Sequence, residues 1–419
     1  MNDLGKRIRK LRREKNLTLA ELAGERLTKG MLSLIENGKA QPSIESLHYI
    51  AERIGVEVST LLNDNNVEQL RVLLFEIEED FKKISNPYIK KDIKKMKQMY
   101  EKIQIHREKL LGNHYEEIRL LDIATRLETF LHIDDDPSTM YDVIEFYEKI
   151  HAYNQVIHCF SFLGSTAFNR NDYRIALQFM QEGEKRVHPF LHLIDKLSIL
   201  DMHYILTVLY AAIDDKTNTQ RHLELALKIA HENKIYYRLD DFYRFTLSQA
   251  IGEGDEVKSR YYLEKLTQHA AFTEDKAATS MLAFFKAHYA NNIEKNYKQV
   301  PSFASYLDYS IDLEEKKDIL ILYKIEEAYS YWAQGLYKEA IESSKNIEIP
   351  SYVHHPTDLA IMYQGFAIRA LSHLELGEKE LAKSEILYAY QGVNDFPDTL
   401  YKSFIQQAYE KIQYGKRAR

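Results

Sequence analysis

The sequence predicts an all-α protein in which a short N-terminal helical domain precedes a long array of helix pairs. Glycine and proline number only 15 and 8 among 419 residues. Turn-dense all-β proteins need more of both, so the shortage favours a chain that is mostly helix. Apolar residues recur at helical spacing in residues 1–64, and a motif of small and aromatic residues recurs through the remainder. With 45% hydrophobic and 28% charged residues, the chain has the composition of a folded protein.

Charge is distributed unevenly along the chain. The net charge is −7 overall, yet residues 1–15 hold seven basic and two acidic side chains. A basic segment ahead of an acidic body suggests a module that binds a polyanion, although a solvated first helix explains the same count. The single cysteine, Cys159, excludes a disulfide framework and fits a reducing compartment. No segment resembles a signal peptide or a membrane span, so we expect a cytoplasmic protein with no membrane partner.

Five short helices are predicted within residues 1–64. Residues 4–15 form a basic amphipathic helix, and Thr18 and Glu21 have the spacing of a capping box that opens the second helix. Residues 28–37 form the third helix, which Gly38 ends in a left-handed conformation. Two of the helices are joined by a tight turn, which is helix-turn-helix geometry.

This module resembles the Cro/C1 (Xre) type of bacterial and phage regulator. The matching segments are Leu17-Thr18, Glu21-Leu22-Ala23, Ile35-Glu36-Asn37-Gly38, Pro42-Ser43 and Leu47 through Leu61. The resemblance implies a DNA-binding domain over residues 1–64, with residues 28–37 as the recognition helix in the major groove. One departure is Leu19, which stands where the family usually has a glutamine that bridges DNA and the recognition helix. A scaffold used only for protein contact is the alternative.

The resemblance also implies which side chains face a double-stranded DNA operator. Met31, Leu32 and Ile35 are expected to pack against the core, which leaves other positions of the helix for the bases. Lys29 is suited to guanine, and Ser33 to a base edge or a phosphate. The base-facing positions are Lys29, Gly30 and Ser33, the phosphate contacts are Arg7, Arg13, Asn37 and Lys39, and Thr18 and Thr28 complete the predicted set.

Residues 65–72 are predicted to be a hinge leading into a helix near Glu68. In residues 73–419 a small residue, an aromatic residue, a turn and an alanine recur, which is the pattern of tetratricopeptide (TPR) repeats. About eight or nine helix pairs are expected, with a capping helix over residues 399–413. The position five residues after each turn falls at Ala176, Thr219, Ser259, Tyr297, Ala340 and Ala382, about 41 residues apart. Such pairs stack into a right-handed superhelical solenoid with a concave binding groove.

A Cro/C1-type domain joined to a TPR array resembles the RRNPP group of quorum-sensing regulators of Gram-positive bacteria. By chain length and repeat number it is most similar to the NprR branch. The resemblance implies a peptide-responsive transcriptional regulator, a homodimer or homotetramer, in which a short signalling peptide bound in the TPR groove controls the oligomer.

In the NprR branch the peptide-free form also binds a response-regulator protein of the sporulation phosphorelay. A TPR scaffold or inhibitor of such a partner, with DNA binding secondary, is therefore the alternative function. A constitutive repressor whose array serves only oligomerisation is a third.

In the RRNPP group, asparagines and charged residues on the inner helices hold the peptide. Counting from the first-helix leucine of each unit gives nine groove candidates in this chain. They are Ser161, Ser165, Asn169, Tyr204, Arg244, Ser248, Lys286, Tyr329 and Gln364. The Asn169 side chain can accept from a peptide N–H and donate to a peptide C=O, and Arg244 can form a bidentate hydrogen-bonded pair with a carboxylate. Solvated helix positions are the alternative for each of them.

No enzyme, cofactor or metal site is predicted. Residues 252–254 contain two glycines but lack the third glycine and the preceding strand of a nucleotide-binding loop. His188 and His192 have the spacing of helical metal ligands, but a proline interrupts the turn between them. His354 and His355 are expected in a loop. The sequence thus indicates a binding protein without catalytic residues.

Overall fold

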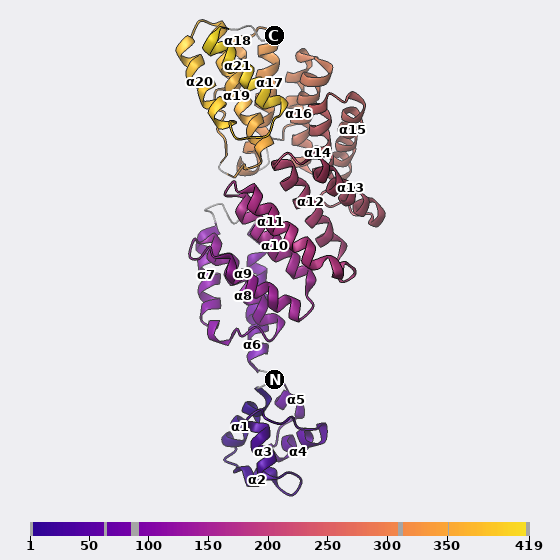
Figure 1. Cartoon of the computed structure of the whole chain (residues 1–419), viewed down its shortest axis with the longest axis vertical. Coiled ribbons are helices and arrows are strands. Elements are labelled where there is room, and N and C mark those ends of the chain that lie inside the picture. The colour runs from indigo at the N-terminus through magenta and orange to yellow at the C-terminus, as the bar shows by residue number, and fades with distance from the viewer. Residues whose placement is uncertain (1–2, 63–64, 85–91, 309–312, 351, 416–419) are drawn as a thin grey trace. The chain divides into compact units, whose positions relative to one another are not determined.

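The computed structural model describes residues 3–62, 65–84, 92–308, 313–350 and 352–415. These residues form helices and turns without any strand, which confirms the all-α class (Figure 1). The chain divides into two compact units, residues 1–150 and 151–419. Among the described helices, none has the length and apolar character needed to cross a bilayer.

The first five helices pack around one small core. They are α1 (Asp3–Glu14), α2 (Leu19–Ala23), α3 (Lys29–Glu36), α4 (Ile44–Ile54) and α5 (Val58–Leu62). Ile8, Leu22, Leu32, Ile50 and Leu61 meet at the centre, and all five side chains are fully buried. Each contributes roughly 1.5–3 kcal/mol by leaving water, so this core holds the five short helices together.

Local hydrogen bonds set the boundaries of α2 and α3 as predicted. The Glu21 amide donates to Thr18 Oγ1 at 3.1 Å, and the Thr18 amide donates to Glu21 Oε2 at 2.7 Å. This reciprocal pair is a complete capping box. Thr28 caps α3 by accepting from the Met31 amide at 3.1 Å, and Gly38 follows the helix at φ 68°.

Four further α-helices belong to the described part of the first unit. They are α6 (Asn65–Phe81), α7 (Ile93–Gln104), α8 (Tyr115–Phe130) and α9 (Pro137–Lys149). Helix α8 packs against α6, α7 and α9. Residues 65–72, predicted as a hinge, belong to α6, which starts three residues before the predicted Glu68.

The second unit is a TPR-like array of antiparallel helix pairs. The pairs are α10 (Tyr153–Phe168) with α11 (Tyr173–Val187), α12 (Lys196–Ala212) with α13 (Lys216–Asn233), α14 (Leu239–Glu253) with α15 (Glu256–Thr273), α17 (Leu313–Ala333) with α18 (Tyr337–Ser344), and α19 (Pro356–Glu375) with α20 (Lys379–Gly392). Helix α16 (Lys276–Tyr289) instead pairs with a 3-10 segment, η5 (Tyr297–Tyr306). Helix α21 (Leu400–Tyr414) packs on α19 and α20, in the region where the sequence predicts a capping helix over residues 399–413.

The repeat motif marks where paired helices cross. Ala176, Ser259, Ala340 and Ala382 are all fully buried there, as small residues must be for two helix backbones to approach closely. Tyr297 is half-buried at the start of η5, because this unit has no regular second helix.

Candidate nucleic-acid interface and repeat-domain cavity

Helix α3 presents one exposed face and one buried face. Leu32 and Ile35 are buried as predicted, and Lys29 at the first position is exposed. The predicted packing role of Met31 is wrong, because its side chain is 45% exposed. Successive helix positions are about 100° apart, so the residue preceding Leu32 points away from the core. Ser33 is half-buried on the border between the two faces.

Several predicted DNA contacts already hold hydrogen bonds within the domain. Arg7 Nη1 donates to the Leu61 carbonyl at 2.7 Å, which ties α1 to α5. Asn37 Nδ2 donates to the Ser33 carbonyl at 2.7 Å and lies 3.4 Å from Ser33 Oγ. The hydroxyls of Thr18 and Thr28 serve as helix caps. Arg13, Lys29 and Lys39 are exposed, and their side chains form no hydrogen bond with the described residues; Gly30 is exposed as well.

A buried ion pair that the sequence prediction missed joins α1 to the end of α3. Arg12 Nε donates to Glu36 Oε1 at 2.6 Å, and Arg12 Nη2 donates to Glu36 Oε2 at 3.0 Å. The two residues are 9% and 4% exposed. The hydrogen bonds that Arg12 donates to the Glu36 carboxylate raise the pKa of Arg12. Gly5 lets the helices meet, since a Cβ there would lie 2.1 Å from the Ile35 carbonyl oxygen. The pair therefore fixes α3 on the domain.

A cavity of about 890 Å³ lies within the second unit. Its walls include residues of α12, α14, α16, α17, α19 and α21. Three of the nine groove candidates line it, namely Tyr204 on α12 and Arg244 and Ser248 on α14. The predicted groove residues that meet at this cavity therefore come from two neighbouring helix pairs, α12 with α13 and α14 with α15.

The other six groove candidates lie outside the lining of this cavity. They are Ser161, Ser165, Asn169, Lys286, Tyr329 and Gln364. Gln364 is buried at 4% exposure within α19. Tyr329 packs against Trp332 and Phe404. Ser165 is exposed and Asn169 is half-buried at the end of α10.

Acidic side chains outnumber basic ones in the lining of the cavity. Six carboxyl groups contribute to it against the basic residues Lys216 and Arg244. The six are Asp214, Asp241, Glu253, Asp318, Asp358 and Asp398. Burial raises the pKa of Asp318, and the nearby charge of Asp358 raises it further.

Arg244 is already engaged by carboxylates of its own helix. Its Nη2 donates to Asp240 Oδ2 at 3.1 Å and also contacts Asp241. Burial works against the charged guanidinium, but the two aspartates outweigh it and raise the pKa of Arg244. A ligand carboxylate at Arg244 would compete with both aspartates.

The segment that precedes α19 forms one edge of the cavity. Residues 352–355 line it and lie outside any helix, which confirms the loop predicted for His354 and His355. Tyr173 Oη donates to the His354 carbonyl at 2.6 Å, across 181 positions of the chain. The Phe168 ring lies edge-on to the His354 ring at 6.4 Å. These contacts join the first helix pair of the unit to the segment before α19.

The N-terminal residues match a known domain family. Residues 5–67 match a family described as a helix-turn-helix domain, so this part of the chain is a helix-turn-helix domain. No curated protein matches the sequence.

Similar solved structures share little sequence identity with the chain. PlcR of Bacillus thuringiensis, in complex with the peptide PapR7 and DNA, is 14% identical at a TM-score of 0.31, over 65% of this chain and 98% of that one. The apo form of the competence regulator ComR from Streptococcus vestibularis is 16% identical at a TM-score of 0.32, over 70% and 98%. ComR from S. thermophilus, with DNA and its signalling peptide ComS, is 16% identical at a TM-score of 0.32, over 69% and 99%.

Proposed function

We propose that this chain is a DNA-binding transcriptional regulator whose TPR-like domain binds a short signalling peptide. One pairing carries the proposal: a helix-turn-helix domain at residues 5–67 and a cavity of about 890 Å³ inside a separate helical array. Ligand cavities in proteins span about 300–1,000 Å³, and helical solenoids bind extended chains on their inner surfaces. The resemblance of the sequence to the NprR branch of RRNPP regulators leads to the same function.

The acidic lining favours a peptide with net positive charge. Six carboxyl groups face two basic side chains in the cavity, and Arg244 is already paired. Clefts lined by one sign of charge concentrate ligands of the opposite sign. A free peptide amine or a lysine would therefore bind more strongly than an acidic residue.

Peptide binding is proposed to act on the oligomer through the helix array. The walls of the cavity come from α12 and α14, early in the second unit, and from α19 and α21, near its C-terminal end. A peptide that contacts both groups of helices binds more tightly to the conformation in which both reach it. The difference in its affinity for the two conformations then sets how far the equilibrium between them shifts. In a homodimer or homotetramer this changes the spacing of the DNA-binding domains, and with it the fit to two operator half-sites.

A bulky residue in the cavity is expected to abolish the peptide response. Candidate peptides come from a small open reading frame beside the gene, and the Ser248→Tyr variant should lose at least about tenfold in peptide affinity, because the added ring occupies the cavity. Binding is measured by calorimetry, and the mass of the full-length protein by sedimentation with and without peptide. Ser165→Tyr is the matched control, since Ser165 is an exposed groove candidate outside the cavity.

Two results would count against the peptide proposal. One is an unchanged oligomer and unchanged DNA affinity with every peptide. The other is equal loss of peptide binding in the two tyrosine variants. The first would favour the alternative in which the array binds a partner protein, such as a response regulator. The second would show that peptide binding does not depend on this cavity in particular.

Lys29→Ala is expected to weaken DNA binding by about 1–3 kcal/mol if Lys29 contacts a base. Lys29 is exposed at the first turn of α3. The test uses a duplex selected from a random pool and one unrelated duplex, with affinity measured at two salt concentrations. Equal weakening on both duplexes, with a salt slope lower by about one, would assign Lys29 to a phosphate instead. Lys228→Ala, on the exposed surface of α13, is the control and should bind as the unchanged protein does.

A further inference from the structure

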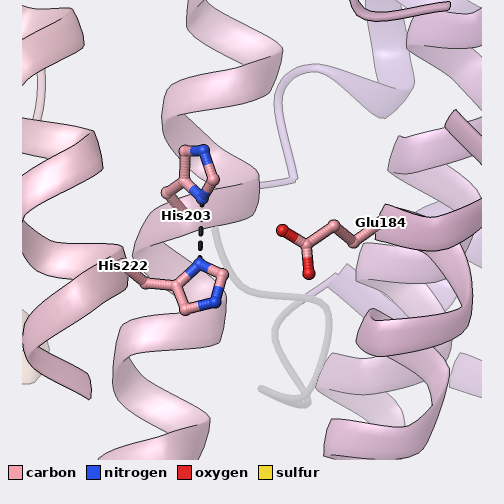
Figure 2. A group of neighbouring side chains, drawn as sticks. All are labelled: Glu184, His203 and His222. Atoms are coloured by element: carbon pink, nitrogen blue, oxygen red, sulfur yellow. Dashed lines mark hydrogen bonds between the residues drawn. The ribbon is translucent and has the colours of Figure 1, made fainter. Parts of the chain in front are cut away.

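Three ionisable side chains from three helices converge within the second unit. Glu184 lies on α11, His203 on α12 and His222 on α13, and one potential ligand atom from each lies within 4.8 Å of the others. Figure 2 shows the two imidazole rings facing each other, with the Glu184 carboxylate directed toward them. His203 and His222 are 8% and 1% exposed, and Glu184 is half-buried.

We propose that Glu184, His203 and His222 bind a divalent transition-metal ion, for which Zn²⁺ is the best match. Two imidazole nitrogens and one carboxylate oxygen form a ligand set typical of zinc, with a fourth position left for water. Nitrogens bound to zinc at about 2.0–2.1 Å in a tetrahedron lie roughly 3.3 Å apart. His203 Nδ1 and His222 Nδ1 are 3.0 Å apart, so the two nitrogens already have nearly the required separation.

The rings are held in place by their surroundings. The His222 ring stacks on Tyr210 at 5.4 Å between centroids, and the Tyr210 hydroxyl accepts from Gln181 Nε2 at 3.0 Å. Because Gln181 and Glu184 are both on α11, this contact also holds α11 against the histidines. The ligand atom of Glu184 lies within 4.8 Å of those of the two histidines, at most about 1.5 Å more than the separation of two ligand atoms around a tetrahedral zinc ion.

Burial shifts the pKa of all three side chains. It lowers the pKa of His203 and of His222 to about 4. The exposed Arg221 adds positive charge that lowers both values. Burial raises the pKa of Glu184, opposed by the charges of Arg221 and His188.

A purely structural histidine pair explains only part of this arrangement. The hydrogen bond between His203 and His222 satisfies one nitrogen of each ring without any ion. It does not account for Glu184, whose carboxylate has no hydrogen-bond donor in the described part of the chain. A bound cation would accept a direct bond from this carboxylate, on which the charges of Arg221 and His188 also act.

Zinc titration of the full-length protein tests the proposal. After dialysis against a chelator, we expect one Zn²⁺ per chain, a higher Tm with Zn²⁺ than with chelator, and visible bands from tetrahedral Co²⁺ as a second probe. Glu184→Gln should weaken zinc binding by more than about tenfold, the change that even outer-shell substitutions produce. Its side chain keeps its shape, so the fold remains intact.

His222→Gln should remove the same site, and His231→Gln should leave it unchanged. His231 is an exposed histidine of the same helix, α13, and therefore measures adventitious binding by surface histidines. Zinc binding that is equal in the unchanged protein and in Glu184→Gln would overturn the proposal, and would leave His203 and His222 as a hydrogen-bonded core pair. If His222→Gln fails to fold, the Glu184→Gln comparison still decides the question.

Discussion

Replacing Arg12 with methionine should destabilise the helix-turn-helix domain by about 3–5 kcal/mol, the typical cost of breaking a buried ion pair. The Glu36 carboxylate, only 4% exposed, would lose both of its guanidinium hydrogen bonds. The Leu17 carbonyl would also lose the donor that Arg12 Nη1 provides at 2.7 Å. Arg9 Nε lies 4.0 Å from Glu36, too far to replace these bonds. Because Glu36 ends α3, the helix proposed to read DNA loses its attachment to α1.

Amide hydrogen exchange over residues 3–62 of the full-length protein measures this loss. Protection in α1 and α3 should fall sharply in Arg12→Met and stay unchanged in Arg13→Met, because Arg13 is the exposed neighbour on the same helix. The double variant Arg12→Met with Glu36→Met should recover much of the stability, since apolar pairs often replace buried ion pairs without cost. Equal protection in the Arg12 and Arg13 variants would show that the pair does not hold α3 in place.

The helices of the N-terminal domain were predictable because their signals are local. The capping box of Thr18 and Glu21 is readable from two positions three residues apart, and it forms as expected. The Arg12–Glu36 pair was not readable, because residues 1–15 hold seven basic side chains and only the packing of α1 on α3 decides which one is buried. Met31 was mispredicted for a related reason, since an apolar residue beside a core position can still face solvent.

The repeat period was also predictable, but the lining of the cavity was not. Small residues such as Ala176 and Ala340 recur because each helix crossing needs one. The lining depends on distant parts of the chain, including residues 352–355 and α21, which no count within one repeat can place. The irregular η5 unit also breaks the register on which such a count relies.

The cluster of Glu184, His203 and His222 was also not predictable from the sequence, because its residues meet only in the folded chain. Its histidines are 19 positions apart on different helices, so no short motif links them. His188 and His192, which do have the spacing of a metal-binding motif, lie in a 3-10 segment with a proline between them.

Asp122→Asn should destabilise the helices around α8 by about 3–5 kcal/mol at pH 7. Asp122 is fully buried, and its carboxylate accepts from Arg126 Nε at 2.6 Å, from Arg119 Nη1 at 2.5 Å and from Tyr147 Oη at 3.1 Å. Asparagine keeps the size of the side chain but removes the charge. Arg119 would retain its hydrogen bond to Glu78 at 2.8 Å. At position 122, however, Arg119 and Arg126 would meet a neutral amide in place of a carboxylate.

The same network makes this part of the protein acid-sensitive in a defined direction. Burial alone would raise the pKa of Asp122, but Arg126 and Arg119 outweigh it and hold the pKa below its usual value. The charged carboxylate therefore stabilises the fold fully above pH about 4, the pKa of an unfolded aspartate. That contribution is lost as pH falls through the lower pKa of the folded state.

Urea unfolding of the full-length protein at pH 7 and at pH 3 separates the contribution of the Asp122 charge from that of its shape and hydrogen bonds. Hydrogen exchange in α8 is the local readout. The difference in unfolding free energy between the unchanged protein and Asp122→Asn should be large at pH 7 and smaller at pH 3, because protonation of Asp122 in the unfolded state reduces the stability of the unchanged protein there. Asp142→Asn, an exposed aspartate on α9, should match the unchanged protein at both pH values. A constant difference across this range would mean that Asp122 acts through its shape and hydrogen bonds, and that its charge does not stabilise the packing of α8.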